Sequence, residues 1–194
     1  METSNQEAGW LKRGRQRSAV AQAIYKPMTE MQILEKARLL APRIQLRDVW
    51  FQLRQLGEKE LTYCLTPQPV TGKLYFLTET GRTAVAEGYG KAVQPLPEDI
   101  DWNRYALIMR AKVRHLILEE LARPCRQGMQ EKTATEIRKR LLDAYPLCLN
   151  SVLRALKELT RLRLARLKTS EKSETRKLYV LTPMGRRLVR EMQR

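Results

Sequence analysis

The stretch KLYFLTETGRTAV at residues 73–85 returns as KLYVLTPMGRRLV at residues 177–189, with eight of thirteen positions identical. A match this dense at one constant offset of 104 residues indicates an internal duplication. Upstream the offset becomes 103, and apolar residues again recur at matching positions: Val49, Leu53 and Leu56 against Val152, Leu156 and Leu159. The one-residue difference falls in a predicted loop, where insertions cost little. Each copy is therefore expected to be one folding unit.

The first copy is predicted to contain three helices and then a two-stranded hairpin. The end of a first helix is expected at 17–24 and a second helix at 29–40, and strands are expected at 61–66 and 73–78. The third helix ends at Gly57, and its buried face is marked by apolar residues at three- and four-residue spacing: Leu46, Val49, Trp50, Leu53 and Leu56.

The second copy repeats this plan with a longer first helix. The predicted elements are helices at about 102–122, 133–144 and 149–159, strands at 164–169 and 177–182, and a closing helix that follows. Thr182 is the expected N-cap of that closing helix, with Pro183 at its first position. Thr29 and Thr133 align just before the second helix of each copy, where an N-cap is expected.

A connector separates the two copies. Residues 86–101 hold two Gly, two Pro and an acidic cluster, which is typical of a linker. A chain of 194 residues is long enough for two small domains that each bury a modest core. We therefore predict two domains, residues 1–94 and 95–194.

The charge of the chain favours a polyanionic partner. The sequence holds 37 Lys and Arg against 21 Asp and Glu, a formal net charge of +16. The excess is uneven, because residues 1–90 hold 13 basic and 9 acidic side chains whereas residues 91–194 hold 24 and 12. The second half is therefore expected to be the stronger electrostatic anchor.

Three helices followed by a hairpin, closed by the pattern Leu-Tyr-x-Leu-Thr-x-x-Gly-Arg, resemble the winged-helix transcription regulators of bacteria and archaea. The resemblance implies a mainly α fold with small β-hairpins (α+β), built as two tandem winged helix-turn-helix domains. It also implies that the third helix enters the major groove of DNA while the hairpin, or wing, touches phosphates or the minor groove. Winged helices also serve as protein-binding modules, so the fold alone does not fix the function.

In the first copy, the expected DNA-contacting face of the third helix is rich in Arg and amide side chains. Arg can contact guanine with two hydrogen bonds and Gln can do the same to adenine, while Asp48 can accept from cytosine or orient Arg47. The candidate contacts in this copy, one of them on the wing, are Arg43, Arg47, Phe51, Gln52, Arg54, Gln55 and Lys73.

In the second copy, the corresponding face carries more plain charge. Lys and several Arg release counterions from phosphates whatever the base sequence is. This helix is therefore expected to bind the DNA backbone more than it recognises bases. The candidate contacts on the helix and the wing are Asn150, Ser151, Arg154, Lys157, Arg161, Lys172, Arg176 and Lys177.

Other conspicuous residues are predicted to be structural. The tryptophans Trp10, Trp50 and Trp102 are interpreted as packing anchors, and Tyr75 and Tyr179 as residues at the edge of the core. His115, the single histidine, is assigned no metal. The basic run at 12–17 is either an arm along the DNA backbone or the solvent-exposed face of a helix. Residues 138–140 are expected to lie on a solvated face of the second helix of their copy.

No motif for catalysis is present, so we expect a non-enzyme without a cofactor or metal. Cys64, Cys125 and Cys148 are odd in number and far apart, which predicts free thiols. No apolar run approaches the roughly 20 residues that a membrane span requires. We expect a cytoplasmic, nucleoid-associated protein.

These observations predict a double-stranded DNA-binding protein, with transcription regulation as its role. The alternatives are a non-specific architectural or replication-initiation protein, and a scaffold in which the less basic first unit recruits a partner or a second chain. A homodimer that places one unit of each chain on DNA also stays open. RNA is a less favoured target, because the deep, narrow major groove of an RNA helix offers a helix little to read.

Overall fold

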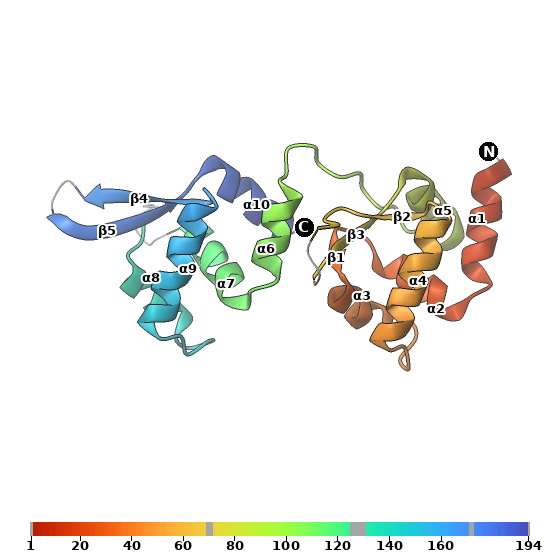
Figure 1. Ribbon diagram of the computed structural model, residues 1–194, viewed down its shortest axis with the longest axis horizontal. Coiled ribbons are helices and arrows are strands. Elements are labelled where there is room, and N and C mark those ends of the chain that lie inside the picture. Colours follow the sequence, from red (N-terminus) through yellow and green to blue (C-terminus); the bar gives the residue numbers. More distant parts are fainter. Residues whose placement is uncertain (1, 69–71, 125–130, 171–172, 194) are drawn as a thin grey trace. The chain divides into compact units, whose positions relative to one another are not determined.

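The computed structural model describes residues 2–68, 72–124, 131–170 and 173–193 (Figure 1). The chain is mainly helical with small antiparallel sheets, and it divides into two compact units, Met1–Glu98 and Asp99–Arg194. The sequence placed this boundary after residue 94. The difference arises because Leu96 packs against the core of the first unit and so belongs to it.

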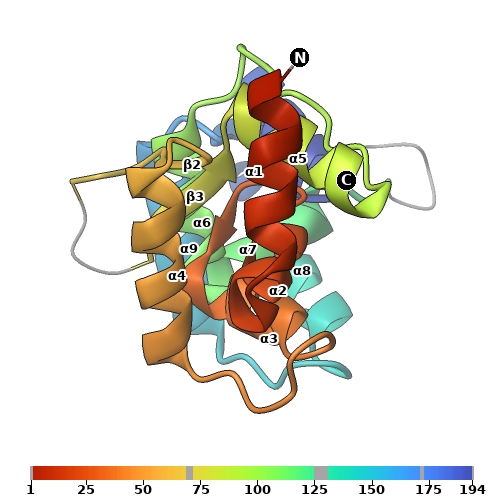
Figure 2. The same cartoon turned by 90° about the vertical axis from the view of Figure 1, so that its right-hand side faces the viewer.

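Unit 1 has a single hydrophobic core formed by its helices and a three-stranded antiparallel sheet of order β1-β3-β2. Its elements are α1 (Glu2–Lys12), α2 (Arg15–Ala23), β1 (Met28–Thr29), α3 (Glu30–Ala37), α4 (Leu46–Glu58), β2 (Thr62–Cys64), β3 (Leu74–Leu77) and α5 (Glu79–Tyr89). The first and last helices, α1 and α5, lie side by side (Figure 2). Val20, Ile33 and Leu56 from α2, α3 and α4 are fully buried between the helices, which holds α4 in place.

Unit 2 repeats the same element order. Its elements are α6 (Trp102–Met109), α7 (Lys112–Ala122), α8 (Ala134–Leu141), α9 (Leu149–Arg161), β4 (Ala165–Ser170), β5 (Ser173–Leu181) and α10 (Pro183–Gln193). Strands β4 and β5 form an antiparallel hairpin, and an isolated bridge from Lys132 to Tyr179 takes the place that β1 has in unit 1.

The single long helix expected at 102–122 is wrong, because the chain breaks into α6 and α7 at Ala111. Ala111 is extended, with φ −123° and ψ 101°, and Gly14 between α1 and α2 has nearly the same backbone angles, φ −122° and ψ 109°. The break lets the apolar residues of α6 and those of α7 face one core. Alanine favours helix, so its type gave no signal of this turn.

The repeated sequence motif forms the same joint in both units. Thr78 donates its hydroxyl to the carbonyl of Glu60 and accepts from the N–H of Gly81, and Thr182 does the same with Arg163 and Gly185. Glu60 and Arg163 both have positive φ, 55° and 58°. A Cβ on Gly81 would overlap the carbonyl oxygen of Leu61, so only glycine fits there. Backbone geometry thus explains why the threonine and the glycine of the motif are identical in the two copies.

The predicted N-caps of the second helices are confirmed. Thr29 forms a capping box with Gln32 at the start of α3, and Thr133 forms one with Glu136 at the start of α8. The predicted connector is partly wrong at its beginning, because α5 continues to Tyr89 and ends on Gly90, which has a left-handed φ of 68°.

A buried ion pair distinguishes the core of unit 2 from that of unit 1. Lys132 is 0% exposed and Glu120 only 2%, with Nζ of Lys132 3.0 Å from Oε1 of Glu120. Lys132 also donates to the backbone carbonyls of Glu120 and Arg123. Because Met28 bridges Tyr75 as Lys132 bridges Tyr179, unit 1 places an apolar methionine at the same position.

Candidate nucleic-acid interface

A single stripe of cationic and amide side chains runs along the exposed face of α9. Asn150, Arg154, Lys157 and Arg161 are all exposed, and their spacing of four, three and four residues places them on one side of the helix. The opposite side is fixed by Val152, Leu156 and Leu159, which are fully buried. The core therefore holds the helix so that this stripe faces outward as a unit.

The other polar residues near this stripe are held by neighbours. The carboxylate of Glu158 lies 3.0 Å from Nε of Arg114 on α7, so it is engaged away from the stripe. Ser151 is half-buried, and its Oγ lies 3.1 Å from Sγ of Cys148 at the N-cap of α9. Hydrogen bonds from the Ser151 side chain and backbone lower the pKa of the Cys148 thiol. Ser151 is thus less accessible than the sequence predicted.

The corresponding face of α4 has almost no net charge. Arg54 is exposed, but its Nε lies 2.9 Å from Oε1 of Glu58, and Nε of Arg47 lies 3.9 Å from Oδ1 of Asp48. Phe51 stands between them in the stripe and is 57% exposed. Where α9 carries three cations, α4 carries two, each beside a carboxylate. The sequence predicted this contrast in charge between the two helices.

Two residues of α4 have the opposite placement to that predicted. Gln52 is only 7% exposed, and its Oε1 has no hydrogen-bond partner among the residues that the structure describes. Trp50, assigned to the core, is 54% exposed. With a turn of about 100° per residue, position 52 lies about 40° around the helix from the buried Leu56 and about 60° from the buried Val49, and the apolar character of Trp50 masked its outward position. Gln52 therefore cannot contact a base.

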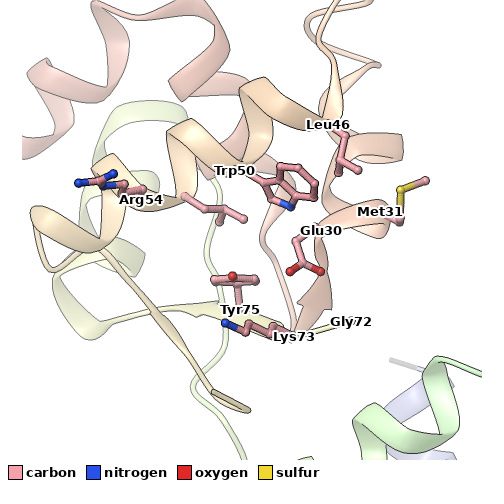
Figure 3. Close-up of a pocket in the computed structure, with 9 residues that line it drawn as sticks. Glu30, Met31, Leu46, Trp50, Arg54, Gly72, Lys73 and Tyr75 are labelled. Atoms are coloured by element: carbon pink, nitrogen blue, oxygen red, sulfur yellow. The ribbon is translucent and has the colours of Figure 1, made fainter. Parts of the chain in front are cut away.

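A cavity of about 530 Å³ lies between α4, α3 and the hairpin of unit 1 (Figure 3). Trp50 and Arg54 project from α4 on one side, and Tyr75 and Lys73 from β3 and the residue before it on the other, with Glu30 of α3 between them. Burial, and then the charge of Glu30, raise the pKa of Tyr75 to about 12, so its hydroxyl stays protonated. Tyr75 is thus both an edge of the core and a wall of this cavity.

The basic run near the N-terminus is divided between helices and is no extended arm. Arg17 is held inside unit 1, with its guanidinium 3.6 Å from the ring centre of Trp10 and a hydrogen bond to the Trp10 carbonyl. Burial, and then nearby Arg13, lower the pKa of Arg17. Arg15 and the exposed Arg43 line a second cavity of about 510 Å³ beside the turn that precedes α4.

The structure describes some of the candidate DNA contacts on the hairpin of unit 2. Lys177 is exposed on β5, where it pairs across the ladder with Thr169. Lys172 lies outside the described residues, and only the backbone of Arg176 is described. In unit 1, Gln55 is half-buried, and Lys73 is half-buried against the cavity described above.

Most residues assigned structural roles have internal partners. Nε2 of His115 lies 3.3 Å from Oε1 of Glu119, and Trp102 stacks edge-on against Tyr105. The stretch 138–140 is only partly solvated, because the side chain of Arg138 is half-buried and donates to a backbone carbonyl.

The cysteines that the structure describes are not paired. Cys64 and Cys148 are free thiols, and Cys125 lies outside the described residues. Within the described ranges, no three His, Cys, Asp or Glu side chains gather where they could hold a metal ion. Nor does that part of the chain contain a helix with the length and apolar character needed to cross a bilayer.

Comparison of the chain with protein-family models, with curated proteins and with solved structures finds no match. A functional assignment therefore has to rest on the geometry and charge of the two units.

Proposed function

We propose that each unit is a winged helix and that the chain binds double-stranded DNA. Helices α4 and α9 are the groove-facing helices in this proposal, and the hairpins that follow them are the wings. The observation that carries the proposal is the stripe of Asn150, Arg154, Lys157 and Arg161, exposed along one side of a helix whose other side is locked in the core.

The chemistry of the stripe fits a DNA groove. Arg and Lys neutralise phosphates or contact guanine, and Asn150 offers the paired donor and acceptor that recognise adenine. The charge of the whole unit supports the same partner, because residues 99–194 hold 23 basic and 11 acidic side chains whereas residues 1–98 hold 14 and 10. Unit 2 is therefore the principal electrostatic anchor.

Duplication of the unit increases affinity without new contacts. A second unit tethered by a short connector meets its target at an effective concentration on the order of millimolar, so two weak modules bind tightly together. We propose a transcription regulator as the role of such a tandem binder. Half-sites in successive grooves would together span about 20 base pairs, without symmetry because the two helices differ in sequence.

Non-specific architectural or replication-initiation binding is a second candidate, and a specific observation favours it. Burial of Gln52 removes one of the amides expected to read adenine, while the cations of α9 remain exposed. Cations on phosphates give affinity without sequence preference. The exposed residues thus favour contacts with the DNA phosphate backbone over contacts with the bases.

Selection from a randomised 25-base-pair duplex library at several salt concentrations tests both candidates. An enriched motif supports the regulator, and tight, salt-dependent binding without a motif supports the architectural role. Absence of binding to any duplex contradicts DNA binding altogether.

Charge variants then test the assigned surface. Arg154→Ala and Lys157→Ala should each reduce the slope of log K against log salt by about 0.9 if the side chain neutralises one phosphate. Arg190→Ala removes an exposed cation from α10 of the same unit and is the matched control. Equal slopes for the three variants would show that the stripe is not the contact surface.

A further inference from the structure

Trp50 is an exposed aromatic side chain that borders a cavity of unit 1. It leaves 54% of its surface to solvent on α4, where the neighbouring Phe51 is also exposed, and its indole forms one wall of the 530 Å³ cavity. The phenol of Tyr75 lines the same cavity from the hairpin (Figure 3). A large exposed aromatic surface beside a hollow is typical of a binding site.

The residues that line this cavity are only partly repeated in unit 2. By the offsets of the duplication, Trp50 corresponds to Leu153 and Glu30 to Ala134, whereas Tyr75 corresponds to another tyrosine. Unit 2 therefore retains the tyrosine of the hairpin but lacks the indole and the carboxylate. Since the fold is built equally well without them, Trp50 and Glu30 are not required by the architecture.

We propose that this cavity receives one unpaired nucleobase of the bound DNA, held against the rings of Trp50 and Tyr75. The inference rests on the proposed DNA binding and assigns unit 1 a preference for DNA in which a base has left the stack. Every base has a π-face, so stacking on aromatic side chains accepts unpaired bases in general.

The polar residues of the cavity match the edges of such a nucleotide. The carboxylate of Glu30 is an acceptor for the amino groups that adenine, cytosine and guanine carry. Lys73 lines the same cavity and supplies positive charge for a flanking phosphate, whereas Arg54 at its rim is paired with Glu58. The volume of about 530 Å³ falls within the range of roughly 300–1,000 Å³ that is usual for small-molecule sites.

The proposal explains why α4 and α9 differ in charge. A helix that anchors a duplex needs cations, which α9 has, and a helix beside a site for an unpaired base needs aromatic surface, which α4 has in Trp50 and Phe51. Unit 2 then holds the duplex and unit 1 detects a local defect in its stacking.

The test compares two 25-base-pair duplexes that differ only in one extrahelical 2-aminopurine. Dissociation constants come from the anisotropy of an end label, and stacking is followed by quenching of the 2-aminopurine fluorescence. The full chain is expected to bind the bulged duplex about tenfold more tightly than the paired one and to quench its fluorescence. Trp50→Ala should lose both effects, so that its affinities for the two duplexes become equal.

Two further variants separate stacking from other causes. Trp50→Phe keeps an aromatic face and should retain most of the preference. Leu153→Ala removes the exposed apolar side chain at the equivalent position of unit 2 and should retain all of it. Because neither Trp50 nor Leu153 is a buried core residue, circular dichroism of each variant should match the parent chain.

Equal affinity of the unmodified chain for both duplexes would overturn the inference and leave DNA binding intact. A preference that survives in Trp50→Ala would also overturn it, because the flexibility of the bulged duplex would then be its cause. Failure to bind either duplex would instead overturn the proposed function together with the inference.

Discussion

Replacing Lys132 by methionine should destabilise unit 2 strongly. Lys132 and Glu120 are almost completely buried, and the Lys132 ammonium supplies a charge partner 3.0 Å from the carboxylate. Lys132→Met leaves Glu120 facing only Arg140 at 3.3 Å and Arg123 at 3.5 Å. Breaking a buried pair by removing one partner costs about 3–5 kcal/mol when the remaining charge is left uncompensated, and here Arg140 and Arg123 still compensate Glu120 in part. We expect a loss near the lower end of that range.

Removing both charges should cost less. In Glu120→Leu/Lys132→Met the freed guanidinium groups of Arg140 and Arg123 are partly exposed and reach water, so no buried charge is orphaned. The carbonyl of Arg123 still loses the donor that Lys132 provides, which costs about 1–3 kcal/mol when the acceptor stays unsatisfied. The double variant should therefore be about 2 kcal/mol more stable than Lys132→Met.

Hydrogen exchange read by mass spectrometry measures this in the full chain, because peptides of unit 2 are resolved from those of unit 1. Exchange in the peptides of α7 and α9 should accelerate in Lys132→Met and recover in part in the double variant, while the peptides of α2 and α4 serve as an internal reference. A loss below about 1 kcal/mol in Lys132→Met, or a double variant as unstable as the single one, would refute the argument.

Three other predictions use the same structure. Gly81→Ala and Gly185→Ala should each destabilise only their own unit by about 1–3 kcal/mol or more, because the new Cβ overlaps a backbone carbonyl, and hydrogen exchange reports each unit separately. Stability should fall as pH rises from about 10 to about 12, because Tyr75 has a pKa of about 12 against an ordinary value of 10.0 and only the unfolded chain ionises there. In denaturant unfolding measured at a series of pH values, Tyr75→Phe should reduce the fall in unfolding free energy over this range. An unchanged fall would exclude Tyr75 as its source. In DNA titrations Lys157→Ala should weaken binding more than Arg54→Ala, since Arg54 is paired with Glu58, and the reverse order would contradict the role of α9 as anchor.

The apolar periodicity of the sequence predicted the third helix and the hairpin of each unit with small errors at their ends. That success has a physical cause, because a helix buries residues three and four apart and a strand alternates its faces. The capping threonines were predictable for the same local reason, since a cap involves only residues within one turn. Trp50 and Gln52 were assigned wrongly because residue type was allowed to outweigh the helical angle.

The duplication, the order of the second helix, third helix and hairpin in each unit, the contrast in charge between the two halves and the caps were determined by the sequence alone, because each depends on local spacing or on a simple count. Only the tertiary structure decided that Lys132 and Glu120 meet in a core, that the expected first helix of unit 2 breaks at Ala111, and that Trp50 and Tyr75 enclose one cavity. These features join residues from different elements. Their proximity is set by how the elements pack, and packing has no signature in the spacing of neighbouring residues.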